Sequence, residues 1–234
     1  NNISVIYKEI GDFTTSLDYQ NRALQIRYEL KDSTGTASSY NNIGDIYKGM
    51  NNYSDALEYY KKALYLSEAL ECKRTTALYS NNIGETYCLS SNYTEAVKHF
   101  RKALLAAEEI GAKSIISRVH SGLSRVYLKT EQYNNALTYA EQAYNTAVEI
   151  NFKELIIESS EILANIYAAL GKYQKAYEYH KEYKTQSDSL INKENIKNIT
   201  AMEYEYRYKQ ERDMARAEQE KTNALKEEEL RRQK

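Results

Sequence analysis

The sequence predicts an all-α superhelical solenoid of antiparallel helix pairs with a 40-residue repeat, followed by a long C-terminal helix. Three observations support this fold class. Similar segments recur every 40 residues, apolar residues within each segment follow helical spacing, and the chain of 234 residues contains no proline to interrupt a helix. A repeat of this length is typical of a solenoid, because one helix pair cannot bury its apolar face without a neighbour.

The repeat is carried by five segments without an insertion, which start at Asn1, Asn41, Asn81, Ser121 and Glu161. Tyrosine recurs at the seventh position, as Tyr7, Tyr47, Tyr87, Tyr127 and Tyr167. An aromatic residue recurs at the thirteenth, as Phe13, Tyr53, Tyr93, Tyr133 and Tyr173, and a small residue at the sixteenth, as Ser16, Ala56, Ala96, Ala136 and Ala176. We therefore expect five units within residues 1–185, the first truncated because it opens inside a helix: 1–40, 41–80, 81–120, 121–160 and 161–185.

Each unit is expected to contain two amphipathic helices. In the second unit the apolar side chains follow helical spacing on both sides of a turn, as Ile43, Tyr47, Met50, Tyr53, Ala56, Leu57, Tyr60, Ala63 and Leu64. Short polar or glycine-containing turns divide the helices of a unit, at Gly11-Asp12, Asn51-Asn52, Ser91-Asn92, Glu131-Gln132 and Gly171-Lys172. Between units, Gly111 and Asn151 suit the left-handed conformation that ends many helices.

Small residues are predicted to let the two helices of a unit approach closely. They recur at Ser4, Gly44, Gly84, Ser124 and Ala164 and face the column that contains Ala56. A larger side chain there would hold the crossing helices apart. The recurring tyrosines are expected to be core residues that bury the ring and direct the hydroxyl toward the surface or a neighbouring backbone group.

Roughly residues 1–184 resemble the tetratricopeptide repeat family. The resemblance is carried in the second unit by Ile43, Gly44, Tyr47, Tyr53, Ala56, Tyr60 and Ala63, and five copies stay in phase. The unit departs from the family in its length, which is usually about 34 residues, and in lacking the closing proline. The longer unit implies longer helices.

In that family the first helix of each unit lines a concave face, which binds extended peptides or partner segments. The resemblance therefore implies a non-catalytic scaffold that binds a protein or peptide and needs no cofactor. The candidate contacts lie on the exposed side of the first helices and are Asn2, Asn42, Asp45, Asn82, Glu85, Arg118, Arg125 and Asn165.

A pair of asparagines opens three consecutive units, at Asn1-Asn2, Asn41-Asn42 and Asn81-Asn82. Asparagine is a weak helix former, and its amide can both donate to and accept from a peptide backbone. Asn2, Asn42 and Asn82 are thus candidates for a ladder along an extended ligand, which ends where Gly122 and Ile162 replace them. The alternative is that the asparagines repeat because the unit was duplicated, and that they are solvated or bonded between helices.

Charge and composition argue against several functions. Lys and Arg total 32 and Asp and Glu total 33, which leaves no net field to attract nucleic acid. No apolar stretch reaches the length of a membrane span. His99, His120 and His180 lack a second metal ligand at helical spacing, so neither a metal site nor an enzyme is expected.

The repeat is expected to end after Tyr183, because Arg207 stands where a sixth unit would need tyrosine. Residues 186–234 are predicted to form a capping segment and a long charged helix or coiled-coil linker. An apolar stripe could cover the end of the array, formed by Ile196, Ile199, Met202 and Tyr206. Acidic and basic residues then intermix, a pattern typical of a solvated helix or a weak coiled coil.

Repeats followed by such a segment resemble bacterial repeat-bearing sensor proteins, in which a membrane span and then a histidine kinase, nucleotide cyclase or DNA-binding output domain follow. The resemblance implies a periplasmic sensing part of a signal-transduction protein, anchored in the membrane after Lys234. If the chain is not such a sensor, a cytoplasmic location is expected. The alternative function is a structural oligomerisation scaffold, a homodimer through the C-terminal helix with no specific groove ligand.

Overall fold

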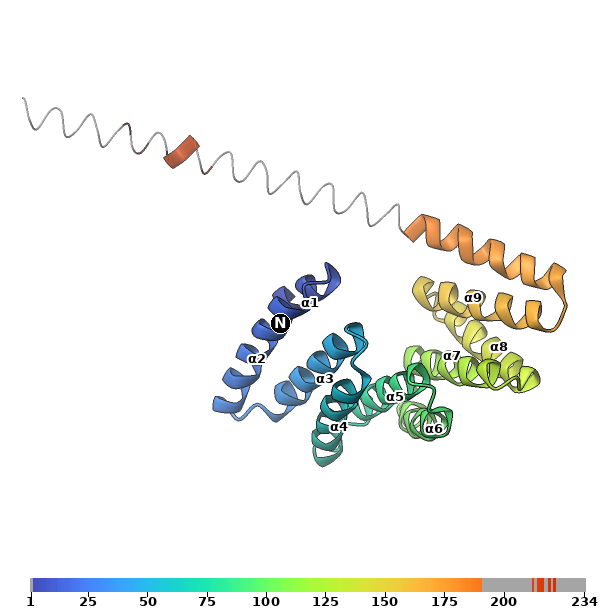
Figure 1. Cartoon of the computed structure of the whole chain (residues 1–234), viewed down its shortest axis with the longest axis horizontal. Coiled ribbons are helices and arrows are strands. Elements are labelled where there is room, and N and C mark those ends of the chain that lie inside the picture. Colours follow the sequence, from blue (N-terminus) through green and yellow to red (C-terminus); the bar gives the residue numbers. More distant parts are fainter. Residues whose placement is uncertain (1, 191–211, 213, 217–218, 220, 222–234) are drawn as a thin grey trace, which may run out of the picture. The chain divides into compact units, whose positions relative to one another are not determined.

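The array is a succession of helices joined by short turns (Figure 1). A computed structural model of the chain describes residues 2–190, 212, 214–216, 219 and 221, and no strand occurs among them. The chain divides into two units, Asn1–Lys184 and Thr185–Lys234. The helices of the first unit are α1 (Asn2–Glu9), α2 (Phe13–Glu29), α3 (Ser33–Gly49), α4 (Tyr53–Ala69), α5 (Lys73–Leu89), α6 (Tyr93–Glu109), α7 (Lys113–Lys129), α8 (Tyr133–Glu149) and α9 (Lys153–Ala169). Residues 173–190 are also helical.

The 40-residue period is two helices and two turns. Each helix from α2 to α9 has 17 residues, and three residues separate it from the next. Each helix packs against the one that follows it, and the first helices α5, α7 and α9 also contact one another in sequence. The predicted all-α array of antiparallel helix pairs is confirmed. The predicted unit starts fall inside α3, α5, α7 and α9. Each of these hairpins therefore begins eight residues before the unit start that the sequence repeat predicted.

Each three-residue turn ends one helix and starts the next. Lys31 has a positive φ of 54°, its N–H donates to the Tyr28 carbonyl at 3.1 Å, and the Asp32 N–H donates to the Arg27 carbonyl at 2.9 Å. The Asp32 carboxylate then accepts from the Gly35 N–H at 2.8 Å and caps α3. The same left-handed residue recurs at Gly11, Asn51, Glu71, Ser91, Gly111, Glu131, Asn151 and Gly171. The conformation predicted at Gly111 and Asn151 is confirmed, and it extends to lysine and glutamate.

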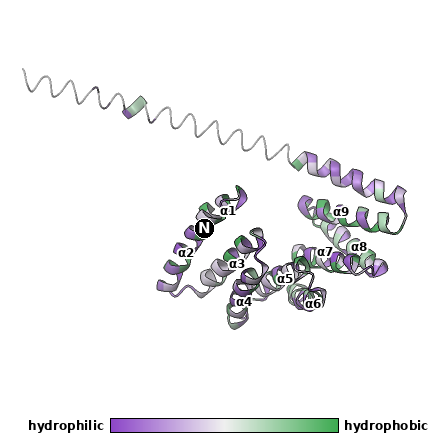
Figure 2. Cartoon of the chain, in the orientation of Figure 1, coloured by the Kyte–Doolittle hydropathy of each residue, from purple (hydrophilic) through white to green (hydrophobic). Residues whose placement is uncertain are grey.

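Burial is uneven along the array. In Figure 2, α2 is coloured mainly as hydrophilic, whereas α9 carries a long hydrophobic stretch. Accordingly α2 buries Ser16 and Gln20, while α9 buries residues that include Leu155, Leu163 and Ile166. The first hairpin therefore contributes little to the apolar core, and the largest cluster of buried apolar residues lies among α5, α6 and α7.

Close approach of the paired helices is confirmed at the small residues. Ala56, Ala96 and Ala136 are fully buried. The Ser124 hydroxyl donates to the Ala136 carbonyl at 2.8 Å, which ties α7 directly to the backbone of α8. Side chains of this size leave room for the facing backbone, as the sequence predicted.

Two glycines stand against a fully buried aromatic ring from the second helices. A Cβ atom on Gly84 would lie 2.8 Å from Cδ1 of Phe100, and one on Gly122 would lie 2.4 Å from its Cζ. Gly44 stands in the same relation to the ring of Tyr60, at 2.7 Å. Phe100 therefore fixes the spacing of α5 and α7. The ring also explains why the asparagine column ends at Gly122, since no side chain fits there.

The recurring tyrosines were predicted to be core residues, and here the prediction needs correction. Tyr167 is buried, but Tyr47, Tyr87 and Tyr127 are only half-buried. Each stacks on a ring twelve residues later, with centroids 5.5 to 5.7 Å apart, in the pairs Tyr7–Tyr19, Tyr47–Tyr59, Tyr87–His99, Tyr127–Tyr139 and Tyr167–Tyr179. Ring stacking between the two helices replaces full burial.

Most of the C-terminal prediction lies outside the described residues. This holds for the apolar stripe of Ile196, Ile199, Met202 and Tyr206 and for nearly all of the charged helix or coiled-coil linker. Those features remain predictions.

The spacing role of Phe100 predicts a coupled pair of substitutions. Gly84→Ser should destabilise the array by about 1–3 kcal/mol, because its Cβ overlaps the ring, and Phe100→Ala by about 3–5 kcal/mol. Combined, they recreate the pair that the next hairpin holds at these positions, Ser124 and Ala140. The free energy of unfolding of the three variants is measured in urea. The double variant should lose less of it than the two single variants lose in sum. Additive losses would contradict contact between these positions.

Candidate functional site

Three successive first helices form a groove that we call the inner groove. It is a cavity of about 650 Å³ lined from α5, the turn after α5, the start of α6, α7 and α9. The lining residues are Cys88, Leu89, Ser91, Tyr93, Arg125, Leu128, Lys129, Glu161, Ile162 and Asn165. Leu89, Leu128 and Ile162 supply apolar surface, and Arg125, Lys129 and Glu161 supply charges of both signs. The volume lies within the range of ligand-binding clefts.

A smaller cavity of about 100 Å³ adjoins the inner groove. It shares Cys88, Leu89 and Arg125 with the groove and adds Glu85, Phe100, Gly122 and Glu158. The ring that sets the helix spacing therefore also lines this cavity. Consequently the packing of Phe100 and the shape of the inner groove depend on each other.

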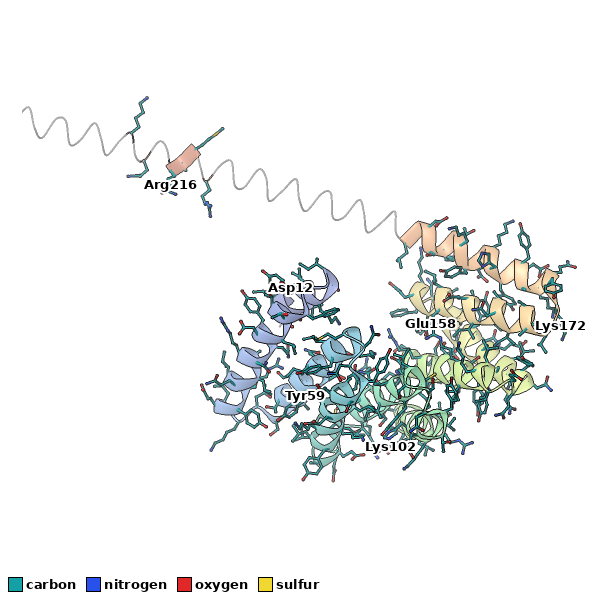
Figure 3. The ribbon with its side chains drawn as sticks, in the orientation of Figure 1. Asp12, Tyr59, Lys102, Glu158, Lys172 and Arg216 are labelled. Atoms are coloured by element: carbon teal, nitrogen blue, oxygen red, sulfur yellow. The ribbon has the colours of Figure 1, made fainter. Side chains whose placement is uncertain are left out.

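An ion pair joins α7 to α9 at the smaller cavity. Arg125 Nη2 lies 3.1 Å from Glu158 Oε1, and the Glu158 side chain is 27% exposed. Glu158 projects from α9 (Figure 3). Burial raises the pKa of Glu158 above its ordinary value of 4.5, an effect that Glu85 and Glu161 reinforce and that Arg125 and Arg118 oppose. The smaller cavity thus contains a carboxylate that holds its proton more tightly than usual.

A polar network joins α3 to α5, on the N-terminal side of the inner groove along the array. Lys48 Nζ lies 3.1 Å from Glu85 Oε2 and 4.0 Å from Asp45 Oδ1. The Tyr60 hydroxyl donates to Asp45 Oδ1 at 2.5 Å, and burial raises the pKa of that hydroxyl, with the Asp45 charge adding to it. The Asn81 amide donates to Glu85 Oε1 at 2.8 Å. These charges are therefore largely satisfied within the array.

The asparagines take part in the same network. Asn41 and Asn81 are buried, at 8% and 1% exposed. The Asn82 amide donates to Asn41 Oδ1 at 2.8 Å, and the Asn41 amide donates to Asp45 at 3.4 Å. The bonding between helices that was the alternative interpretation thus occurs at Asn41 and Asn82. Asn42 is half-buried and has no hydrogen bond within the described part of the chain.

The predicted site residues fall into two groups. Asp45, Asn82 and Glu85 belong to the network between α3 and α5, where Asn42 also lies. Arg125 and Asn165 line the inner groove, and Arg118 is exposed on α7 and lowers the pKa of Glu158 by its charge. The side chain of Asn2 lies outside the described residues. Their role in binding a ligand remains a prediction.

Sequence reasoning missed the apolar lining of the inner groove. Leu89 is 55% exposed, and the corresponding residues of the other units are Glu9, Gly49, Lys129 and Ala169. A leucine in a column of polar and small residues is a signal that the sequence offered. Leu128 and Ile162 carried no such signal, because apolar residues are expected in amphipathic helices.

Across residues 2–190 and the few described beyond, no three His, Cys, Asp or Glu side chains gather where a metal could bind. Over the same residues, every helix is too short or too polar to span a bilayer.

Family models and solved structures agree on the repeat. One model of the tetratricopeptide repeat matches residues 1–69 and 74–147, and another matches residues 160–189. BtubC (BKLC) from P. vanneervenii has a TM-score of 0.68 at 18% identity, over 80% of this chain and 78% of that one. No curated protein matches the sequence.

Two further crystal structures share the fold. The Rap conjugation gene regulator of the plasmid pLS20, in complex with a Phr peptide, has a TM-score of 0.70 at 16% identity, over 80% of this chain and 52% of that one. Aspartyl phosphate phosphatase F from Bacillus subtilis has a TM-score of 0.63 at 17% identity, over 80% and 58%. At these identities the similarity concerns the fold alone.

The raised pKa of Glu158 predicts a pH dependence of stability. The folded state binds this proton more tightly than the unfolded chain, so the contribution is fully present below pH 4.5 and is lost as pH rises through the folded pKa. Relative to Glu158→Gln, the wild type should therefore become more stable as pH falls from neutrality toward 4.5. Urea unfolding across this range measures the difference. Glu154→Gln, at an exposed position of α9, is the control and should show no such trend. A difference that is constant with pH, or that shrinks on acidification, would contradict the assignment.

Proposed function

The chain belongs to the tetratricopeptide repeat family, and from this membership we propose that it is a non-catalytic scaffold that binds an extended peptide or protein segment in the inner groove. The observation that carries the proposal is the cavity of about 650 Å³ lined by α5, α7 and α9. These three helices are the first helices of successive hairpins. In this family the first helices line the concave face, which binds ligands.

The geometry of the groove suits an extended chain. Packed helices are about 8–10 Å apart, whereas an extended peptide advances about 3.3 Å per residue. Successive first helices would therefore meet roughly every third residue of the ligand. Leu89 and Leu128 would receive apolar side chains, and Asn165 would bond the peptide backbone. Among proteins with a similar fold, the Rap conjugation gene regulator of the plasmid pLS20 has been crystallised with a Phr peptide, which supports a peptide as the ligand class.

The asparagine ladder is part of the same proposal. The Asn42 amide has no hydrogen bond among the described residues. The Asn82 side-chain NH2 bonds Asn41, which leaves the side-chain oxygen of Asn82 as an acceptor for a ligand. We propose that both contact the part of the ligand that passes over α3 and α5. Because Asn82 also joins the two helices, Asn82→Ala should lower both affinity and stability, and only Asn42→Ala tests the ladder without a structural effect.

We also propose that the chain is the sensing part of a bacterial signal-transduction protein. The support is the order of repeats and charged segment in the sequence, in which residues 186–234 would connect the array to an output domain. The coding sequence beyond Lys234 tests this role. A membrane span followed by a kinase, cyclase or DNA-binding domain is expected, and a stop codon there would contradict it.

A matched pair of asparagines tests the inner groove. Peptides selected from a random display library against the full chain would be titrated against Asn165→Ala, on the groove, and Asn145→Ala, an exposed position of α8. Loss of one or two hydrogen bonds should weaken binding about threefold to tenfold for Asn165→Ala. Asn145→Ala should bind as the wild type does, and both should melt alike.

Two outcomes would count against the groove. Equal affinities for the two asparagine variants would exclude Asn165 as a contact. A failure to select any peptide, together with a dimer in sedimentation of the full chain, would favour the oligomerisation scaffold instead.

A further inference from the structure

A second groove lies along the exposed side of α6, and we call it the outer groove. It has a volume of about 670 Å³ and runs between α6 and the C-terminal part of α7. Val97, Leu105 and Tyr127 supply apolar surface, and Lys98, Arg101 and Lys102 line it with positive charge. Leu105 is 70% exposed, so its side chain is accessible to a ligand in the groove. Lys102 projects from α6 (Figure 3).

The positive charge is specific to α6 and is not a property of the repeat. Lys98, Arg101 and Lys102 are spaced by three and one residues, so they lie on one face of the helix. The corresponding residues are Glu58, Lys61 and Lys62 on α4, and Thr138, Glu141 and Gln142 on α8. Repetition of the unit therefore does not explain three cations here.

Two of the three cations have an acidic neighbour. Lys98 lies 3.5 Å from Glu95, and Lys102 pairs with Glu68. Arg101 is exposed, and within the described part of the chain its guanidinium has no ion pair, hydrogen bond or ring contact. It is therefore available to a ligand.

In the neighbouring repeats, the side chain that corresponds to Arg101 contacts the tyrosine that corresponds to Tyr127. On α4, Lys61 Nζ lies 5.6 Å from the ring centre of Tyr87. On α8, Glu141 Oε1 accepts from the Tyr167 hydroxyl at 3.0 Å. Arg101 and Tyr127 occupy the corresponding positions and make no such contact in the described structure. Arg101 and Tyr127 both line the outer groove instead.

We propose that the outer groove binds an acidic amphipathic segment of a partner protein. An apolar or aromatic side chain of the partner enters between Val97, Leu105 and Tyr127. A partner carboxylate pairs with Arg101, whose planar guanidinium can bind both oxygens, and a second reaches Lys98. Arginine and tyrosine are enriched among the residues that carry most of the binding energy in protein interfaces. The site is separate from the inner groove, although Tyr93 lines both.

The chain supplies its own variants for the test. Arg101→Glu and Leu105→Asn install the residues that α8 carries at these positions, Glu141 and Asn145, so both substitutions suit a helix of this array. The matched control is Lys153→Glu, an equal change of charge sign at an exposed position of α9. Circular dichroism melts verify folding, and Arg101→Gln replaces Arg101→Glu if that variant unfolds.

The probe is a fluorescein-labelled synthetic peptide in which Glu and Asp alternate with Leu and Phe, titrated against the full chain by anisotropy. Arg101→Glu and Leu105→Asn should each weaken binding by about tenfold or more. The control variant Lys153→Glu should bind as the wild type does. A double variant, Lys98→Glu with Arg101→Glu, should instead prefer the peptide with Lys in place of Glu and Asp.

Three results would overturn the proposal. The first is equal affinity of wild type and Arg101→Glu for the acidic peptide. The second is equal binding of the acidic peptide and its lysine counterpart by the wild type. The third is tighter binding of a short single-stranded RNA that is lost in Arg101→Glu, which would assign the cations to nucleic acid.

Discussion

The contact between Phe100 and the two glycines sets the distance on which the inner groove depends. Because Gly84 and Gly122 lack side chains, α5 and α7 both approach the ring from α6. The same ring lines the small cavity beside Arg125 and Glu158, so the spacing of the helices and the depth of the groove have a common origin. In the preceding hairpin, Tyr60 packs on Gly44 and adds a hydroxyl that bonds Asp45. The position that Tyr60 and Phe100 share on the second helix therefore determines how closely the helices pack. It also determines how polar the surface of the first helices is.

The first-helix face changes character along the array. Between α3 and α5, Lys48 bridges Asp45 and Glu85, and Asn82 bonds Asn41. A ligand there would have to compete with these existing partners. Farther along, Leu89, Arg125 and Asn165 are exposed, and Arg125 pairs with Glu158. Buried polar groups are costly to leave unpaired, whereas exposed ones can exchange water for a ligand. This contrast is why we assign binding mainly to α5, α7 and α9.

The sequence predicted the architecture well because the information is periodic. Columns of tyrosine, alanine and glycine at a 40-residue spacing determine helix pairs, turns and close approach without knowledge of three-dimensional contacts. Contacts between units were harder to predict. The bond from Asn82 to Asn41 joins helices of neighbouring hairpins, and the same residues were equally consistent with a ligand ladder. The left-handed conformation of Glu71 follows from the three-residue turn and opposes the residue's own preference. Both are cases where tertiary geometry outweighs local propensity.

The most direct test of the central claim, that α5, α7 and α9 present the ligand-binding surface, is a crystal structure of the chain with a selected peptide. The account predicts an extended peptide along the inner groove, with contacts to Leu89, Arg125 and Asn165. A peptide bound to the opposite face of the hairpins, with the inner groove occupied by solvent alone, would contradict it.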